Sequence, residues 1–447
     1  MERKMPLPPS ALAVMNALTA RGFDAWVVGG SVRDHLRGQV PHDYDMTTDA
    51  TPEEMKDAFS GMRVIETGIR HGTVTVLSQG VPYEVTTYRV DGAYADHRHP
   101  DGVQFTRDLT GDLARRDFTV NAIAYHPERG YQDPFGGCAD MERKVLRAVG
   151  NPRLRFEEDA LRILRGIRFA ATLGFTLEEE TEAALLEKKD LLTFVSRERI
   201  RDELLKLLVG DCAGAVLRRY RDVLAVCIPQ IAPMFDHPQN TPYHCYDVWE
   251  HSIRTLEALP PDPLLRLAGL LHDIAKPACH ILDGQGISHF RGHQREGAEM
   301  AREIATALRL DKASTQRLAA LVYHHDDRTP PQRGKVLRLL AKVGYPLFLS
   351  LCDLTEADIA AHTRGLPIIE EGLMRVGETR ALGKQLEREG ACYRIQDLSL
   401  NGRDVMEHTA LRGAQVGEAL STLLHAVMDG KVQNERQALL SYLLSLS

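Results

Sequence analysis

The sequence predicts an α+β N-terminal part followed by an all-α remainder. Within residues 1–138, strand-like runs at Ala25–Val28, Gly72–Leu77 and Tyr83–Tyr88 alternate with glycine and aspartate turns. From residue 139 onward, apolar residues recur every three or four positions, which is the spacing of amphipathic helices. A chain of 447 residues is long enough for about three domains.

The composition is that of a globular protein. Hydrophobic residues make up 43% and charged residues 26%, which excludes a disordered or fibrous chain. Charged residues interrupt every apolar stretch before the ~18 residues that a membrane-spanning helix needs. The seven cysteines are scattered and form no C-x-x-C pair, which favours reduced thiols in a cytoplasmic protein. We therefore expect a cytoplasmic protein with no membrane contact and no obligate protein partner.

The formal net charge of −7 excludes a wholly basic nucleic-acid binder but permits a local basic face. A glycine turn, Gly29-Gly30, separates the strand Ala25–Val28 from a helix whose first turn carries Arg33. Such a junction aims backbone N–H groups at an anion, and Arg33 would add a side-chain contact to phosphate. Because Gly-Gly turns are also common without a ligand, this motif needs the support of its neighbours.

Two carboxylates follow at Asp43 and Asp45. Residues two apart on a strand point to the same face, so we expect this pair to lie together. A third carboxylate, Glu84, belongs to a neighbouring predicted strand. Three carboxylates beside a nucleoside triphosphate are suited to two Mg²⁺ ions and to in-line displacement at a phosphate.

With these motifs the chain resembles the tRNA nucleotidyltransferase and poly(A) polymerase family, in its bacterial CCA-adding (class II) branch. The stretches DLARRDFTVNAIAY (112–125), DPFGG (133–137), EDALRILRGIRF (158–169) and DLSLNGRDV (397–405) extend the resemblance. It implies a polymerase-β-like head, and it assigns Arg116 to the nucleotide. The polar segment Arg89–Pro100 is similar to the family's flexible loop, although Arg98-His99-Pro100 departs from the usual pair of arginines before the proline.

Asp159, Arg162 and Arg165 are spaced to share one helix face. In the family, the residues aligned with Asp159 and Arg162 select the incoming base without a template. C and A both present an exocyclic amino donor beside a ring-nitrogen acceptor, which a carboxylate and a guanidinium can recognise together. Arg165 and Arg168 are expected to hold the triphosphate or the RNA backbone.

RNA binding is expected on the later helices of this region. The candidates are basic residues with a predicted shape-based contact to the acceptor arm: Arg197, Arg199, Arg201 and Lys206. An ordinary solvated helix face, balanced by nearby carboxylates, explains the same pattern equally well.

A second constellation is rich in histidine. Half of the 18 histidines lie between His237 and His325, around the sequence LLHDIAK at 270–276. Imidazole and carboxylate together suit a divalent transition metal or Mg²⁺. The pattern resembles the HD phosphohydrolase superfamily, which implies His251, His272, Asp273 and Asp353 as ligands, with Asp358 as the alternative to Asp353. Further ligands of a two-metal site would be His293, His324 and His325.

The predicted organisation has four parts. They are a nucleotidyltransferase head (1–138), a helical neck and body (139–228), an HD domain (244–360) and a tRNA-binding helical tail (361–447), with a proline-containing linker at 229–243. The expected activity is addition of CCA to the 3′ end of tRNA from CTP and ATP by a two-metal mechanism, and the HD domain would hydrolyse phosphoesters at damaged RNA ends. The alternatives are a poly(A) polymerase or an A-only or CC-only adding enzyme, and an HD phosphohydrolase whose head is an RNA-binding module.

Overall fold

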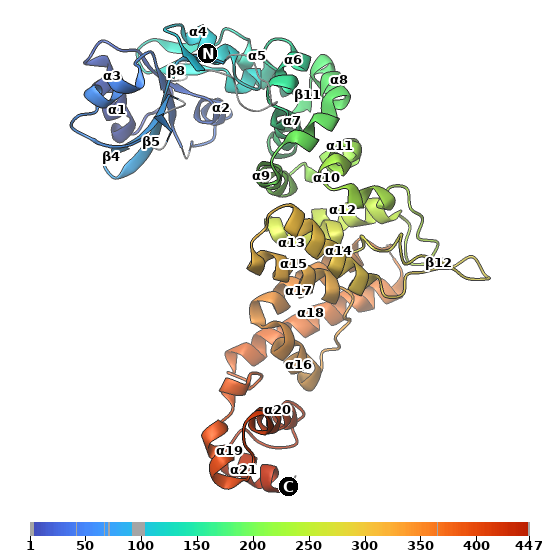
Figure 1. Cartoon of the computed structure of the whole chain (residues 1–447). Coiled ribbons are helices and arrows are strands. Elements are labelled where there is room, and N and C mark those ends of the chain that lie inside the picture. Colours follow the sequence, from blue (N-terminus) through green and yellow to red (C-terminus); the bar gives the residue numbers. More distant parts are fainter. Residues whose placement is uncertain are drawn as a thin grey trace. The chain divides into compact units, whose positions relative to one another are not determined.

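The computed structural model (Figure 1) describes residues 4–41, 43–66, 68–69, 72–91, 103–363 and 365–445. The chain forms two compact units, Met1–Cys227 and Ile228–Ser447. The predicted fold class is confirmed, because a mixed sheet with helices is followed by a helical body and a helical second unit. Within the described ranges, every helix is too short or too polar to cross a bilayer. The predicted loop lies outside the described residues from Gly92 onward.

The head is built on a seven-stranded sheet with the order β3-β4-β5-β2-β1-β8-β9. Its strands are β1 (Ala25–Val28), β2 (Asp45–Thr48), β3 (Arg63–Ile65), β4 (Thr73–Ser78), β5 (Val81–Thr87), β8 (Ala124–His126) and β9 (Gly130–Gln132). Only β2 and β5 pair in parallel; the other neighbours are antiparallel. Separate two-stranded pairs are formed by β6 (Arg89–Asp91) with β7 (Val103–Phe105), and by β10 (Val145–Leu146) with β11 (Thr176–Leu177).

The burial of each strand follows from its place in the sheet. Every residue of β1 is buried because the strand is central, with β2 and β8 on either side. In β4, buried residues alternate with partly exposed ones, as expected for a strand with one face against the core. Helices α1 (Pro9–Thr19) and α3 (Pro52–Ala58) cover that face, and α2 (Gly30–Leu36) lies on the other side of the sheet (Figure 1).

The remainder of the first unit is mainly helical. Its helices are α4 (Leu109–Ala114), α5 (Gly137–Arg143), α6 (Pro152–Glu158), α7 (Leu161–Leu173), α8 (Glu179–Lys188), α9 (Arg197–Leu208), α10 (Ala213–Arg219) and α11 (Arg221–Cys227). Helix α7 packs against both α9 and α10. This packing places the arginines of α7 and α9 on the side of the first unit that faces the nucleotide motifs of the head.

The expectation of one continuous helix through Asp159 is wrong. Helix α6 ends at Glu158, and α7 begins at Leu161. The backbone of Asp159 is extended (φ −136°, ψ 101°), and its carboxylate accepts the N–H of Leu161 at 3.1 Å. An aspartate side chain competes for backbone N–H groups in this way, which favours helix ends over helix interiors. Asp159 therefore lies at a junction between two helices and not on a shared helix face.

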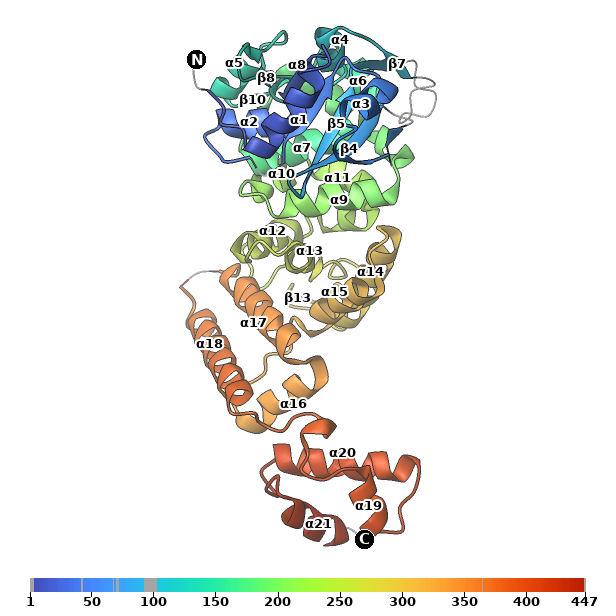
Figure 2. The same ribbon diagram turned by 90° about the vertical axis from the view of Figure 1, so that its left-hand side faces the viewer.

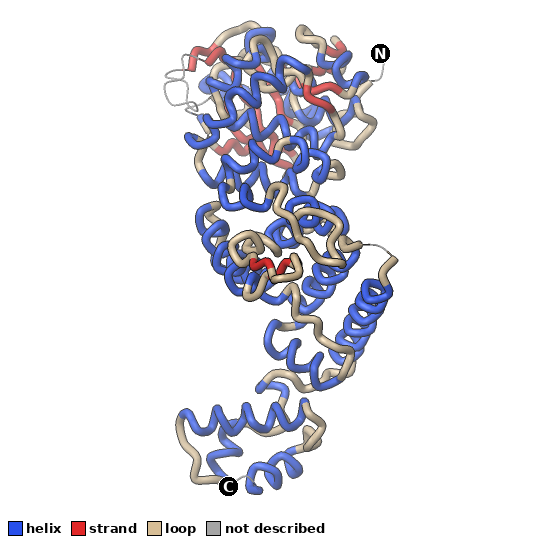
Figure 3. The backbone as a smooth tube through the Cα atoms, turned by 90° about the vertical axis from the view of Figure 1, so that its right-hand side faces the viewer, coloured by secondary structure: helices blue, strands red, loops and turns tan. Residues whose placement is uncertain are grey.

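The second unit contains ten α-helices among its described residues. They are α12 (Val248–Ala258), α13 (Pro263–Leu271), α14 (His293–Ala307), α15 (Lys312–His324), α16 (Arg333–Val343), α17 (Tyr345–Ala360), α18 (Pro367–Arg388), α19 (Gly402–His408), α20 (Ala414–Met428) and α21 (Arg436–Ser445). Helices α14 and α15 form one packed pair and α17 and α18 another, as Figure 2 shows. Figure 3 shows the short hairpin of β12 (Ile281–Leu282) and β13 (Ser288–His289) among these helices. An apolar core shared by α16 to α21 joins the C-terminal helices.

The expected linker has structure of its own. Pro229–Met234 forms a 3₁₀ helix, in which Ile231 and Met234 are buried. Further along, Gln239 is buried and accepts a hydrogen bond from Lys276 at 2.6 Å. The proline-containing segment is therefore a structured start of the second unit and not an unstructured linker.

Two glycines make a matched stability test. A Cβ at Gly137, the first residue of α5, would lie 2.1 Å from the carbonyl oxygen of Thr119, whereas a Cβ at Gly417 in α20 would meet nothing within 4 Å. We expect Gly137→Ala to destabilise the protein by about 2 kcal/mol or more through this backbone clash. Gly417→Ala should stabilise it by about 0.5–1 kcal/mol because alanine favours the helix. Thermal unfolding of both variants checks this; equal melting temperatures would contradict it.

Candidate functional site

A strongly basic cavity of about 470 Å³ lies in the first unit, lined by residues of the head and of the helices that follow it. It is bordered by the β1–α2 turn, the start of β2, the segment after α4, the α6–α7 junction and helices α7 and α9. Its charged lining consists of seven arginines and three aspartates: Arg33, Arg115, Arg116, Arg162, Arg165, Arg168, Arg199, Asp45, Asp117 and Asp159. Gly29 and Gly30 also line it, so the predicted glycine turn does face this cavity. The excess of positive charge suits a polyanion such as a triphosphate.

Carboxylates gather at one edge of this cavity. Asp45 opens β2, and the parallel register of Met46 with Val85 sets it level with Glu84 on β5. Burial raises the pKa of Asp45, Glu84 and Asp43 raise it further, and Arg116 opposes the rise. These carboxylates therefore lie close enough to repel one another, which is the electrostatic condition that a bound cation relieves.

Two details of this edge differ from expectation. Asp43 precedes β2 and does not share its strand geometry, because the strand begins at Asp45. Among the described residues, each set of three ligand atoms within 4.8 Å of one another lies in the second unit, so the head carboxylates are more widely spaced. An all-carboxylate donor set is the type that Mg²⁺ prefers, and substrate phosphates usually complete its coordination.

Arg116 lies near a buried carboxylate, that of Asp112. Asp112 is 0% exposed, contacts Arg116 at 3.7 Å and accepts hydrogen bonds from Thr47 at 3.1 Å and Arg115 at 2.9 Å. Gly29 has φ +73°, and a Cβ there would lie 3.0 Å from the Arg116 guanidinium. Glycine at this turn therefore lets the guanidinium approach the backbone that the phosphates would contact.

The proposed base-selecting residues both line the cavity but are joined to other groups. Arg199 donates to both carboxylate oxygens of Asp159, at 3.2 and 2.8 Å. Arg162 donates to Glu158 at 2.7 Å and to the carbonyl oxygen of Arg115 at 2.9 Å. Arg199 was expected to bind RNA, and the structure places it beside Asp159 instead. Arg199 thus orients the Asp159 carboxylate, and Glu158 orients the Arg162 guanidinium. The spacing of Asp159 and Arg162 in the sequence did not predict these contacts.

The remaining arginines of α7 are also anchored. Arg165 donates to Asp117 at 2.8 Å, and Arg168 donates to Glu203 at 2.8 Å and stacks on Phe169 at 3.5 Å. Burial alone would raise the pKa of Asp117, but Arg165 and its other donors hold it well below its usual value. Because these guanidinium groups are already fixed, binding a phosphate costs them little side-chain conformational entropy.

The other three predicted RNA-binding residues have different surroundings. Arg197 donates to the carbonyl oxygen of Cys227 at 3.2 Å. Arg201 pairs with Asp202 at 2.8 Å, and Lys206 is exposed. RNA contact by these residues stays a prediction.

In the second unit, residues of α12, α14 and α17 and those directly after α13 and α15 form a histidine–aspartate cluster. His251 Nε2 lies 3.0 Å from Asp358 Oδ1 and 3.6 Å from Asp273 Oδ2, and His272 Nε2 lies 3.1 Å from Asp273 Oδ2. The other oxygen of the same carboxylate, Asp273 Oδ1, lies 3.5 Å from His293 Nε2 and 3.7 Å from His325 Nε2. Asp273 therefore stands between two sets of donors, and we call this arrangement the bridged site. Its mixture of imidazole and carboxylate fits two divalent ions.

Backbone hydrogen bonds fix the imidazoles of the bridged site. The Nδ1–H groups of His272, His293 and His325 donate to backbone carbonyl oxygens three residues earlier, at 2.8, 2.7 and 2.7 Å. This pairing turns each Nε2 toward the carboxylates, where it can bind a metal ion once it carries no proton. The arrangement is the one that metal-binding histidines adopt.

Two of the predicted ligands lie elsewhere. Asp353 pairs with Arg380 at 3.0 Å, and Asp358, five residues later, is the carboxylate at the bridged site. The helical spacing explains this correction, since positions five apart on α17 lie on different faces. His324 binds Asp327 through Nδ1 at 2.6 Å and lines a different cavity, so His325 alone of this pair reaches the cluster.

Two cations at the bridged site were not predicted. Lys276 Nζ lies 2.6 Å from Asp273, and Arg328 donates to Asp358 at 2.9 Å. Burial would raise the pKa of Asp273, but His272 and Lys276 hold it well below its usual value. Lys276 follows Asp273 by three residues, which was the available sequence signal, whereas Arg328 had no such signal. His244 and His362 were also missed, although the density of histidines pointed to this region.

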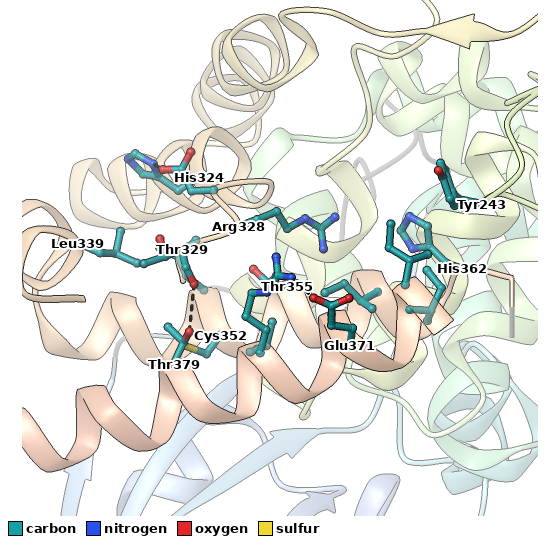
Figure 4. A pocket seen from close by; sticks show the side chains of 18 of the residues that line it. Tyr243, His324, Arg328, Thr329, Leu339, Cys352, Thr355, His362, Glu371 and Thr379 are labelled. Atoms are coloured by element: carbon teal, nitrogen blue, oxygen red, sulfur yellow. Dashed lines mark hydrogen bonds and ion pairs between the residues drawn. The ribbon is translucent and has the colours of Figure 1, made fainter. Parts of the chain in front are cut away.

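The bridged site opens into a polar cavity of about 360 Å³. A second, more apolar cavity of about 410 Å³ lies next to it, and His244, Arg328 and His362 line both. Figure 4 shows His324 on one side of the second cavity and His362 and Tyr243 on the other. The hydrogen bond from Thr379 to the carbonyl oxygen of Thr329, at 3.0 Å, links α18 to the segment after α15. His244, Arg328 and His362 therefore lie between the two cavities and also beside the bridged site.

Known families match the chain from the head to the tail. The model of the poly A polymerase head domain matches residues 25–147, and that of a probable RNA- and SrmB-binding site of polymerase A matches residues 174–234. The HD domain matches residues 242–361, and a putative second domain of tRNA nucleotidyltransferases matches residues 379–443.

Curated relatives match over nearly the whole length. The CCA-adding enzyme of Lactobacillus helveticus is 33% identical over 434 residues, covering 97% of this chain and 96% of the relative. That of Levilactobacillus brevis is also 33% identical, with 96% of each chain covered. Among solved structures, the Bacillus stearothermophilus CCA-adding enzyme in complex with CTP has a TM-score of 0.74 and 29% identity, with 98% of each chain covered. The chain belongs to the family of CCA-adding enzymes, which are tRNA nucleotidyltransferases.

Proposed function

We propose that this chain adds C, C and A to the 3′ end of tRNA without a nucleic-acid template, using CTP and ATP and releasing pyrophosphate. The observation that carries the proposal is the basic cavity of the first unit, which seven arginines line together with Asp45 of the carboxylate edge. A relative of similar fold and length binds CTP. In this scheme the 3′-hydroxyl of tRNA attacks the α-phosphate, and pyrophosphate leaves toward the arginines.

The carboxylates would act as ligands. Asp43, Asp45 and Glu84 would hold two Mg²⁺ ions, which when bound lower the charge on the phosphate and on the attacking oxygen. Burial and, after it, the negative charges of Glu84 and Asp43 raise the pKa of Asp45, and a bound cation would offset both effects. The protein's own contribution is to orient the two substrates along the line of displacement.

Arg116 is the strongest candidate for a phosphate contact. It has one distant ion pair, at 3.7 Å to Asp112, and its Nε has no hydrogen-bond partner in the described part of the chain. Arg33 shares this side of the cavity and is oriented by Asn121 at 2.8 Å. Both guanidinium groups lie by the Gly29-Gly30 turn, where backbone N–H groups add to the binding of an anion.

Base selection is proposed for Asp159 and Arg162. The carboxylate would accept from the amino group of C or A, and the guanidinium would donate to the adjacent ring nitrogen. U and G place a carbonyl oxygen where the amino group would be, and the carboxylate would repel it. Arg199 and Glu158 hold the two side chains in position, so the protein can read the base edge without a template strand.

A substitution at Asp159 tests this proposal. We expect Asp159→Ala to reduce the preference for CTP over UTP by about 10- to 100-fold, the value of one lost paired contact to a base edge. Glu157→Ala is the matched control, because this carboxylate belongs to the adjacent helix α6 and pairs with Lys188, away from the cavity. Single-nucleotide incorporation with each triphosphate measures the ratio. If Asp159→Ala retained the wild-type ratio, the base-selecting role would be wrong.

We assign RNA contact to the neck, body and tail. Arg197, Arg201 and Lys206 on α9 remain candidates for backbone phosphates of the acceptor arm. The division into head (1–138), neck and body (139–228), HD domain (244–360) and tail (361–447) follows the changes in sequence pattern. The Thermotoga maritima CCA-adding enzyme, solved in complex with tRNA, has a similar fold and is 21% identical to this chain.

A second activity is supported by the bridged site. Asp273 lies between two imidazole sets, so we propose that two divalent ions, transition metals or Mg²⁺, bind there and that the site hydrolyses phosphoesters of damaged RNA ends. When bound, such ions polarise a phosphate and activate water. Lys276 and Arg328 lie next to the two carboxylates and would move onto the substrate phosphate once the ions neutralise Asp273 and Asp358.

A further inference from the structure

A third group of ligands stands beside the bridged site and has no assigned role. His244 precedes α12, His251 lies in α12 and His362 follows α17, and one ligand nitrogen from each lies within 4.8 Å of the other two. The ring centroids are 4.3 Å apart for His244 and His362, 5.0 Å for His244 and His251, and 5.1 Å for His251 and His362. We call these three residues the imidazole triad.

His362 has the hydrogen bond that marks the ligands of the bridged site. Its Nδ1–H donates to the backbone carbonyl oxygen of Asp358 at 2.7 Å, as His272, His293 and His325 donate to theirs. The bond fixes the tautomer, so Nε2 keeps its lone pair. The side chain of His362 is 10% exposed, so this lone pair faces the protein interior more than solvent.

The other two members carry buried ring nitrogens without partners. His251 is 0% exposed; its Nε2 faces Asp358, while its Nδ1 has no hydrogen-bond partner among the described residues. His244 Nδ1 is likewise buried without one in the described part of the chain. A buried nitrogen that makes no hydrogen bond is destabilising, and a bound metal ion removes that penalty. His251 donates its Nε2–H to the Asp358 carboxylate of the bridged site, so its Nδ1 keeps the lone pair that the triad needs.

We propose that the imidazole triad binds a third divalent ion, of the borderline transition-metal class that includes Zn²⁺, Co²⁺ and Ni²⁺. Three neutral imidazoles select these ions over Mg²⁺ and Ca²⁺, which need oxygen ligands. Three protein ligands leave one position open, and His244 and His362 border both the polar and the more apolar cavity. An ion held by the triad would therefore lie where the polar and the more apolar cavity meet.

The triad and the bridged site can be separated by experiment. His244 and His362 contribute to the triad alone, and Asp273 belongs to the bridged site alone. The full-length protein, stripped with chelator, would be loaded with Zn²⁺, passed over a desalting column and analysed for bound zinc by mass spectrometry. We expect His244→Ala and His362→Ala each to hold one equivalent less than the wild type. His237→Ala is the matched control, a histidine beside His280 and Phe290 outside all three ligand groups, and should lose none.

Asp273→Asn changes the bridged site and not the triad, so its zinc content shows how many ions the bridged site holds. Loss of zinc in Asp273→Asn with no loss in His244→Ala and His362→Ala would overturn the triad and leave the bridged site intact. One equivalent lost from each histidine variant supports the triad whatever Asp273→Asn does. As a measurement that needs no variant, crystals of the zinc-loaded protein should show an anomalous peak among the three rings. No peak there, with zinc present at the bridged site, would contradict the proposal.

Discussion

Asp45→Asn is expected to reduce CCA addition by about 1,000-fold or more, which corresponds to about 4 kcal/mol of transition-state stabilisation. Asp45 opens β2 at the rim of the basic cavity, level with Glu84. The amide is the same size as the carboxylate but carries no charge, so it binds Mg²⁺ poorly. Rates of incorporation from CTP at saturating tRNA measure the effect.

The binding of tRNA should be unchanged in this variant, because the role proposed for Asp45 is to hold metal and not RNA. Asp57→Asn provides the control, since it removes an exposed carboxylate of the same head from α3, which lies away from the cavity. We expect this control to retain the wild-type rate. Incorporation by Asp45→Asn within tenfold of the wild type would contradict the metal-binding role.

His272→Ala combined with Asp273→Ala is expected to abolish phosphoester hydrolysis and to spare nucleotide addition. The double change removes the bridging carboxylate and one of its imidazoles, so neither set of donors remains complete. We expect the rate on a nucleoside 2′,3′-cyclic phosphate to fall by about 1,000-fold or more. Addition of CCA should stay within about twofold of the wild type, since the basic cavity and the bridged site belong to different compact units.

The residues of this double variant are fully buried, so its folding has to be checked by thermal unfolding. Asp273→Asn alone keeps the size of the side chain and provides the isosteric version. His280→Ala, a change to a half-buried histidine bonded to Ser288, is the matched control and should hydrolyse at the wild-type rate. If both activities were lost together in a folded variant, the two sites would act as one unit. If hydrolysis persisted, the assignment of the bridged site would be wrong.

The elements predicted correctly from the sequence are those whose local residue pattern suits their position in the folded protein. The run Ala25–Val28 is β1 residue for residue, since four consecutive apolar residues suit a central strand. The helix predicted across Asp159 failed because an aspartate can cap a helix as well as continue a charged face, and periodicity does not distinguish the two. The contact of Arg199 with Asp159 joins residues 40 apart, and spacing within one helix contains no such information.

The histidine–aspartate cluster of the second unit could also be predicted only in part from the sequence. Local motifs identified His272 and Asp273, and the spacing left Asp353 and Asp358 open as the last carboxylate. Only the packing of α17 against α12 and α13 places Asp358 at the bridged site and turns Asp353 toward Arg380. His362 joins the cluster because it follows the end of that same helix. Ligands drawn from distant helices therefore required the structure.

The most direct test of the proposed function is extension of a tRNA that ends at the discriminator base. The protein would be incubated with Mg²⁺ and CTP alone, ATP alone or both, and the products resolved at single-nucleotide length. We expect two additions with CTP alone and three with both triphosphates. A long ladder with ATP alone would identify a poly(A) polymerase and contradict the proposal, and no extension at all would contradict nucleotidyl transfer by the basic cavity.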